Sequence, residues 1–187
     1  MDMRVISGKA RGTKLSSIES LSTRPTLDRV KESLFNIIQN NLKGAVVLDL
    51  FAGSGQLGIE ALSRGADKAY LCDINRDAVK MIKQNLEKTK LKDKAVVINE
   101  DYKKALRTLN TNEKFDIIFI DPPYKEDIAV DSIIDIIHES RLKENGIMII
   151  ETDEIERDLR EINKIENIKI IDQRKYGRAS LIFIKEA

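Results

Sequence analysis

Short apolar runs rich in β-branched residues alternate with longer amphipathic segments from residue 45 onward. Apolar runs of this kind are typical of buried strands, whereas apolar residues spaced three and four apart indicate helices. The pattern predicts strands at 45–50, 68–73, 95–99, 115–120 and 146–151. It predicts helices near 56–64, 75–89, 102–109 and 128–139. Such alternation implies right-handed crossovers and a parallel sheet that helices cover on both faces.

The N-terminal region departs from this alternation. Residues 3–14 are predicted to form a short hairpin or arm, because Gly8 and Gly12 permit tight turns. The segment from Thr26 to Asn40 is predicted to be helical, with Thr26 as its N-cap and an apolar stripe along one face.

The C-terminal region carries two strand-like runs, Ile165–Lys175 and Ala179–Lys185, separated by Gly177. This arrangement indicates an antiparallel pair. Together the elements predict an α/β fold with a doubly wound, Rossmann-like, mostly parallel sheet of seven strands that ends in this pair. We expect one domain over residues 1–187, with an arm and helix at 1–44 and an α/β core at 45–187.

The composition is that of a soluble globular protein, with 42% hydrophobic and 34% charged residues. No apolar run approaches the roughly 20 residues of a membrane span, and the N-terminus shows no secretory signal. The single cysteine, Cys72, excludes an internal disulfide and is expected to be a buried structural thiol. His138, the one histidine, gives no basis for a metal site. We therefore expect a cytoplasmic protein without a metal or a membrane partner.

Net charge is only +1, but cations gather at the two ends of the chain. Before Gly44, eight basic residues face four acidic ones, and the candidate nucleic-acid contacts among them are Lys9, Arg11, Lys14, Arg24 and Arg29. A second basic group near the C-terminus comprises Arg174, Lys175 and Arg178. A local basic excess is the footprint expected of a phosphate-backbone partner, and a solvated surface is the alternative.

A glycine-rich loop follows the first predicted strand, and its glycines let the backbone turn tightly and approach a ligand. The helix after it offers unpaired N–H groups, and Gly58 permits that helix to pack closely on the strand. Asp73 ends the second strand where a carboxylate accepts hydrogen bonds from ribose hydroxyls. The spacing predicts a nucleotide-cofactor site formed by Asp49, Phe51, Ala52, Gly53, Ser54, Gly55, Asp73 and Ile74.

Two further acids bear on which cofactor binds. Asp49, just before the glycine loop, would repel a pyrophosphate but attract the ammonium group of a methionine moiety. S-adenosylmethionine carries that ammonium and no phosphate, so Asp49 favours it over NAD. Asp101, after the third strand, is placed either to accept a hydrogen bond from an adenine amino group or to cap the next helix. Glu100 replaces it if the strand ends earlier.

The fourth predicted strand ends in Asp121-Pro122-Pro123-Tyr124, because two prolines cannot continue it. The turn presents a carboxylate, carbonyls without neighbouring N–H groups, and an aromatic ring. Hydrogen bonds from an exocyclic amine to Asp121 and the Pro122 carbonyl would make its nitrogen more pyramidal and aim the lone pair at a methyl donor. Tyr124 is suited to stack on an extruded base, with ordinary packing as the alternative.

The glycine loop and the Asp-Pro-Pro-Tyr turn together resemble the class I S-adenosylmethionine-dependent amino methyltransferases. The stretch from Arg24 to Asn36, the opening Arg4–Gly12 and the closing Lys175-Tyr176-Gly177 are similar to the RsmD-type bacterial enzymes, which methylate the exocyclic N2 of a guanine in small-subunit ribosomal RNA. The resemblance implies that Asp73 binds the cofactor ribose and Asp101 its adenine. It also implies a ribosomal RNA substrate, which we expect within an assembling subunit. We expect the enzyme to be a monomer.

Three other functions stay open at this point. DNA adenine or cytosine amino methyltransferases share both motifs, but they usually carry Asn at the place of Asp121 and commonly need a sizeable recognition domain. A non-catalytic S-adenosylmethionine- or RNA-binding module would be expected to lack Asp121 or Tyr124, and both are present. A nicotinamide oxidoreductase is disfavoured by Asp49.

Overall fold

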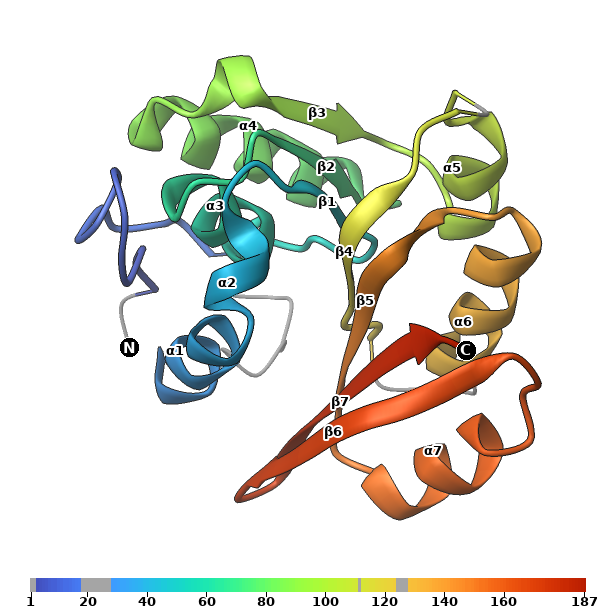
Figure 1. Cartoon of the computed structure of the whole chain (residues 1–187). Coiled ribbons are helices and arrows are strands. Elements are labelled where there is room, and N and C mark those ends of the chain that lie inside the picture. The colour runs from blue at the N-terminus through green and yellow to red at the C-terminus, as the bar shows by residue number, and fades with distance from the viewer. Residues whose placement is uncertain (1–2, 18–27, 111, 124–127) are drawn as a thin grey trace.

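The computed structural model describes residues 3–17, 28–110, 112–123 and 128–187. Its centre is a seven-stranded sheet in the order β3-β2-β1-β4-β5-β7-β6 (Figure 1). The strands are β1 Val46–Asp49, β2 Lys68–Cys72, β3 Ala95–Ile98, β4 Phe115–Ile120, β5 Leu142–Thr152, β6 Ile168–Tyr176 and β7 Ala179–Glu186. Strands β1 to β5 run parallel, and β7 is antiparallel to both β5 and β6. The predicted sheet with its C-terminal antiparallel pair is confirmed.

Helices pack on both faces of the sheet. They are α1 Asp28–Ile37, α2 Gln39–Leu42, α3 Gln56–Ser63, α4 Arg76–Thr89, α5 Tyr102–Thr108, α6 Ile128–His138 and α7 Ile155–Ile162, with a 3-10 turn at Lys92–Lys94. One apolar cluster joins α1, α3 and α4 to one face, and a second joins α5, α6 and α7 to the other. Burial on both faces explains the continuous apolar runs of the central strands. Among the described residues, no helix combines the length and apolar character needed to cross a membrane.

Two elements on the β5 side differ from the predicted pattern. β5 begins at Leu142, four residues before the predicted start. The sequence did not indicate this start, because the polar, exposed Glu144 and Asn145 precede the apolar run. Helix α7 was not predicted at all. Its apolar positions are spaced four and three apart, but they are few and lie among charged residues. Such a short segment carries a weak periodic signal.

The N-terminal helical segment is broken in two. α1 ends at Ile37, and α2 starts at Gln39 after Ile38 adopts φ −93° and ψ 9°. A continuous helix to Asn40 was therefore the wrong prediction, and no Gly or Pro marked the break. The N-cap predicted at Thr26 lies outside the described residues.

The N-terminal arm, residues 3–17, packs onto the core. A single antiparallel bridge joins Arg4 to Lys14, so the predicted hairpin is present as a loop closed by one pair of bridged residues. Along the arm, Val5, Ala10 and Leu15 are buried in the same apolar cluster as α1, α3 and α4. The arm is thus part of the layer that covers one face of the sheet.

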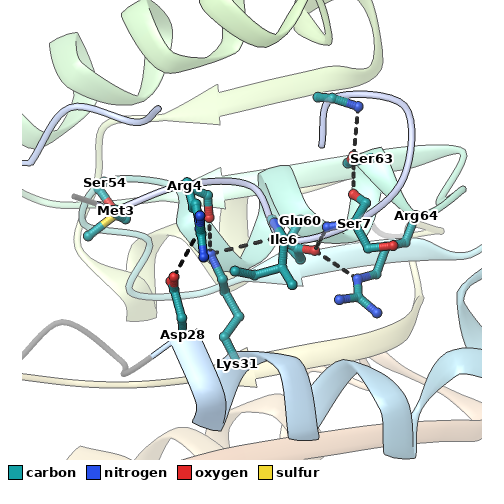
Figure 2. Close-up of polar contacts among 12 residues, drawn as sticks. Met3, Arg4, Ile6, Ser7, Asp28, Lys31, Ser54, Glu60, Ser63 and Arg64 are labelled. Atoms are coloured by element: carbon teal, nitrogen blue, oxygen red, sulfur yellow. Dashed lines mark hydrogen bonds and ion pairs between the residues drawn. The ribbon is translucent and has the colours of Figure 1, made fainter. Parts of the chain in front are cut away.

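A buried ion pair attaches the arm to α1 and α3 (Figure 2). The Lys31 Nζ donates to the Arg4 carbonyl at 2.6 Å and lies 3.6 Å from Glu60 Oε2, with both charged side chains fully buried. Glu60 also accepts the N–H groups of Ile6 and Ser7, at 2.8 and 3.0 Å, and the Arg64 Nε–H at 2.8 Å. Burial lowers the pKa of Lys31, and the charge of Glu60 opposes that shift.

Candidate active site

The acids predicted from the sequence meet at one edge of the sheet. Asp49 ends β1, and Asp73, Asp101 and Asp121 follow the ends of β2, β3 and β4. Because these strands are parallel, their carboxyl ends lie at the same edge, which is where open α/β sheets bind ligands. The four predicted acids are therefore brought together, and β5 adds Glu151, which sequence reasoning had not assigned.

The glycine loop adopts a left-handed turn between β1 and α3. Gly53 and Gly55 have φ of 54° and 80°, a backbone region that side chains with a Cβ rarely occupy. The Ala52 N–H donates to the Cys72 carbonyl at 2.8 Å, and the Gly55 N–H donates to the Ala52 carbonyl at 2.7 Å. A Cβ on Gly58 would lie 2.8 Å from Leu71 Cδ2, which confirms that this glycine permits close packing of α3.

Asp73 holds the loop in place from the neighbouring strand. Its Oδ2 accepts the Gly53 N–H at 2.8 Å, and its Oδ1 accepts the Asn75 N–H at 2.8 Å. The Asn99 amide donates to the carbonyls of Asp73 and Ile74, both at 3.0 Å. Next to this fixed carboxylate, the Ile74 side chain is 68% exposed. An exposed apolar surface beside ordered acceptors suits a ligand with a planar apolar part and hydroxyl groups.

Asp49 is buried beneath the loop, with 2% of its surface exposed. Its Oδ2 accepts the Gly58 N–H at 3.0 Å, in the first turn of α3. Burial raises the pKa of Asp49 to about 7, although the Gly58 hydrogen bond opposes this, and the charge of Asp73 adds to it. The carboxyl group therefore lacks a compensating cation among the described residues.

Asp101 is the N-cap of α5, because its Oδ1 accepts the Lys103 N–H at 2.9 Å. The capping alternative from the sequence is thus confirmed, while a role toward adenine stays a prediction. Beside it, the half-buried Phe51 ring packs on Tyr102, with ring centroids 5.3 Å apart. Ser54 lies at the tip of the loop and donates its hydroxyl to Met3 Sδ of the arm at 3.1 Å.

The turn after β4 presents a half-buried Asp121, a half-buried Pro122 and an exposed Pro123. Burial raises the pKa of Asp121 well above its usual range, and the nearby carboxylates of Glu151 and Asp49 raise it further. Tyr124 lies outside the described residues. The ionised form of a carboxyl group with such a raised pKa is stabilised by any cation that binds or develops beside it.

The remaining predicted residues occupy distinct places. Cys72 is buried with its Sγ 3.5 Å from the Glu100 carbonyl, and burial raises its pKa to about 12, so the structural-thiol prediction is confirmed. The side chains of Lys9, Arg11, Lys14 and Arg29 are exposed on the arm and α1, and Arg24 lies outside the described residues. Within the described ranges, no group of three or more His, Cys, Asp or Glu is arranged to hold a metal ion.

Sequence reasoning missed one residue of the loop's support, Asn85. It is fully buried in α4; its Oδ1 accepts the Ser16 N–H at 2.8 Å, and its amide donates to the carbonyls of Ser16 and Ser54 at 3.0 and 2.9 Å. The available signal was a polar residue on the apolar face of an amphipathic helix, between Ile82 and Leu86. Such a residue needs hydrogen-bond partners when buried.

This strand order, with an antiparallel β7 and a glycine loop at the carboxyl edge of β1, is that of the class I methyltransferases. A solved structure, "Putative methyltransferase yhhF from Escherichia coli", matches with a TM-score of 0.87 and 30% identity, covering 100% of this chain and 98% of that chain. The shared fold therefore extends from the arm to the last strand.

The chain belongs to the family described as Conserved hypothetical protein 95, whose model matches residues 3–185. "Putative rRNA methyltransferase YlbH" of Bacillus subtilis (strain 168) is 44% identical over 153 residues, 81% of this chain and 83% of the relative. "Ribosomal RNA small subunit methyltransferase D" of Haemophilus influenzae is 37% identical over 153 residues, 81% of this chain and 79% of the relative. The RsmD-type resemblance is confirmed.

Proposed function

We propose that this chain transfers a methyl group from S-adenosylmethionine to the exocyclic N2 amine of a guanine in small-subunit ribosomal RNA. The main support is one observation: the glycine loop and the Asp121 turn follow the adjacent parallel strands β1 and β4 and so open at the same edge. Relatives named as small-subunit ribosomal RNA methyltransferases supply the substrate class. The choice of guanine N2 rests on Asp121 in place of Asn and on the family resemblance.

The cofactor half of the site lies over β1, β2 and β3. Asp73 would accept ribose hydroxyls through the lone pairs that Gly53 and Asn75 leave available. The exposed Ile74 would lie against the adenine, and the second oxygen of Asp101 would accept its amino group. The glycine loop would lie against the methionine part, because its backbone leaves space for a ligand at Gly53.

The charges of the site suit a cationic cofactor. Burial raises the pKa of both Asp49 and Asp121; the charge of Asp73 adds to the shift of Asp49, and the charges of Glu151 and Asp49 add to that of Asp121. Each carboxylate is therefore poorly compensated. S-adenosylmethionine carries an ammonium and a sulfonium, and either cation would favour the ionised carboxylates. A pyrophosphate would instead bring further negative charge to these acids. The same residues therefore argue against a nicotinamide dinucleotide.

When bound, S-adenosylmethionine supplies a methyl group activated by its sulfonium. The Asp121 carboxylate and the Pro122 carbonyl would accept the two N–H groups of the guanine amine, which aims its lone pair away from both acceptors. The carboxylate also stabilises the positive charge that develops on this nitrogen, and burial strengthens that interaction. The released proton passes to Asp121 or to water. We assign Tyr124 to stack on the extruded base.

We assign the RNA backbone to the cations of the arm and of α1. The proposed phosphate contacts are Lys9, Arg11, Lys14, Arg24 and Arg29. A catalytic domain with only a short arm has little surface for reading sequence, so a structured ribonucleoprotein is proposed to supply selectivity. The enzyme would act as a monomer on the assembling small subunit in the cytoplasm.

The test uses small ribosomal subunits from cells that lack the gene. Incubation with the purified protein and methyl-labelled S-adenosylmethionine should transfer label to the RNA, and nuclease mapping with mass spectrometry should place it on guanine N2. Calorimetry should detect S-adenosylhomocysteine and no NAD. Label on another base would overturn the guanine assignment, and binding of NAD alone would overturn the cofactor.

A further inference from the structure

Three elements far apart in the sequence, the arm, α1 and the β6–β7 turn, lie on one flank of the molecule (Figure 1). Each of them carries exposed cations. The arm contacts α1, because Arg4 Nε donates to Asp28 Oδ2 at 3.2 Å. α1 in turn contacts the end of β6, because the hydroxyls of Ser33 and Tyr176 share a hydrogen bond. We call the exposed cations of these elements the basic band, which comprises Lys9, Arg11, Lys14, Arg29, Lys175 and Arg178.

Strand direction places the β6–β7 turn at the edge that holds the active site. β7 runs antiparallel to β5, so its first residues pair with the last residues of β5, Leu181 with Glu151 and Ser180 with Thr152. Tyr176 pairs with Ala179, which leaves Gly177 and Arg178 as the turn. The turn therefore extends beyond the carboxyl end of β5. Two strand spacings, about 10 Å, separate β4 from β7 across the sheet.

The charge distribution at this edge favours a nucleotide base at one place and its phosphates at another. The centre is acidic, with Asp49, Asp121 and Glu151 at the carboxyl ends of β1, β4 and β5, and the charges of Glu151 and Asp49 raise the pKa of Asp121. A phosphate is repelled from that centre, whereas an uncharged base can enter it. Lys175 and Arg178 of the β6–β7 turn lie at this edge outside the centre, whereas Lys9 lies further away, beside Ser63 at the C-terminal end of α3. Phosphates are attracted to such exposed cations.

The turn is anchored to α1 through Tyr176, and its two cations are exposed. Tyr176 is half-buried against the apolar cluster that contains α1, so the turn is fixed to that helix. Lys175 and Arg178 are exposed and form no ion pair with any residue in the described ranges. Arg174 differs, because its guanidinium pairs with Asp172 at 3.0 Å, and it is left out of the basic band.

We propose that the β6–β7 turn is a second RNA contact, in which Lys175 and Arg178 hold the phosphates beside the nucleotide that enters the site. The arm and Arg29 continue the same band and hold backbone further along the RNA. This inference rests on the proposed function, since it names the surface that the RNA of that reaction would follow.

The hairpin provides its own matched control. Lys169 pairs with Lys185 at the opposite end of β6 and β7, at the other edge of the sheet. The variant Lys175→Gln/Arg178→Gln and the control Lys169→Gln/Lys185→Gln each remove two positive charges from the same hairpin. Both are compared with wild type by their affinity for in vitro transcribed small-subunit ribosomal RNA at several salt concentrations. Thermal melts check the fold, and calorimetry measures S-adenosylhomocysteine affinity.

The turn variant is expected to bind RNA about tenfold more weakly and to lose a salt-dependence slope of about 1 to 2, since two phosphate contacts are removed. The control should stay within about twofold of wild type, and cofactor affinity should be unchanged in both. An equal loss in both variants, or none in the turn variant, overturns the inference. Because wild-type methyl transfer is measured alongside, failure of the proposed function would be seen separately.

Discussion

Asp49 has two roles: it fixes local structure through a hydrogen bond, and its charge state depends on pH near neutrality. Its Oδ2 accepts the Gly58 N–H and so fixes the first turn of α3 against β1. Burial raises its pKa to about 7, so near neutral pH the carboxyl is partly protonated while no cation is present. A ligand ammonium would shift it to the ionised form. Its protonation state is therefore expected to control cofactor affinity.

We predict that the affinity for S-adenosylhomocysteine rises about tenfold between pH 6 and pH 8. Below about 7 Asp49 is protonated and neutral, and above it the carboxylate attracts the ligand ammonium. Binding near pH 7 should then release protons, which calorimetry in buffers of different ionisation enthalpy detects. Asp49→Asn keeps an acceptor for Gly58 and should bind with a flat pH profile, as should adenosine, which lacks the ammonium. A wild-type affinity independent of pH contradicts the prediction.

Asp121 should determine the acidic side of the methyl-transfer profile. Its raised pKa means that the carboxylate needed to accept the amine is lost as pH falls. We predict that Asp121→Asn lowers kcat about 10²- to 10³-fold and removes this acidic limb. S-adenosylhomocysteine affinity should change by less than about twofold, because Asp121 is placed on the substrate side.

The matched control for Asp121 is Asp116, at the opposite end of β4. Its Oδ2 accepts the Val46 N–H at 2.7 Å and the Lys143 Nζ at 2.8 Å, far from the carboxyl edge. Asp116→Asn should retain the wild-type pH profile. A full-rate Asp121→Asn enzyme would refute the role of that carboxylate.

Between elements, the arm and the glycine loop are joined through α4. Asn85 makes three hydrogen bonds, two to Ser16 of the arm and one to the Ser54 carbonyl of the loop. Met3 makes a second contact to Ser54. The arm, assigned to RNA, and the glycine loop, assigned to the cofactor, therefore share the buried polar group of Asn85. Loss of this group should affect the position of both elements.

We predict that Asn85→Ala lowers the free energy of unfolding by about 2–4 kcal/mol, because buried polar groups of Ser16 and Ser54 lose their partner. It should also weaken S-adenosylhomocysteine binding several-fold, since the loop loses a support. Ser63→Ala is the control, because its hydroxyl accepts the Ala10 N–H and donates to the Ser7 carbonyl without contacting the loop. Denaturant titration and calorimetry measure both quantities. Equal cofactor affinities in the two variants would exclude a special role for Asn85.

Across the whole molecule, the net charge of +1 conceals a division of charge. The carboxyl edge gathers acids, and the flank formed by the arm, α1 and the β6–β7 turn gathers cations. Attraction of RNA should depend on this distribution, because screening limits each interaction to about 10 Å at moderate salt. The net charge of the protein therefore does not indicate how strongly it attracts RNA.

We predict that Lys9→Gln/Arg11→Gln/Lys14→Gln weakens RNA binding and lowers the salt-dependence slope by about 2 to 3, since each lost phosphate contact contributes close to one. Cofactor affinity should be unchanged, because these side chains are exposed and Asn85 and Met3 still hold the arm. Filter binding across a salt series measures the slope. An unchanged slope would assign the arm to folding instead of RNA.

The order and type of the core elements were readable from the sequence, because strands buried on both faces are continuous apolar runs and most helices are amphipathic. Helix α7, the start of β5 and the break at Ile38 could not be predicted from the sequence. Their local signals are weak, and packing against the sheet decides them. Where a residue follows a parallel strand, its place at the carboxyl edge could be foreseen, as for Asp73 and Asp121.

The acids and glycines of the site, the strands that they follow and the positions of local basic excess could all be recognised in the sequence alone. Which residues meet became visible only in the folded molecule: Asp101 caps a helix, Glu151 raises the pKa of Asp121, and Asn85 joins the arm to the loop. Folding also places the β6–β7 turn at the site's edge beside α1. The reason is physical, since strand periodicity is a local property, whereas burial, pKa and side-chain contact depend on neighbours distant in the chain.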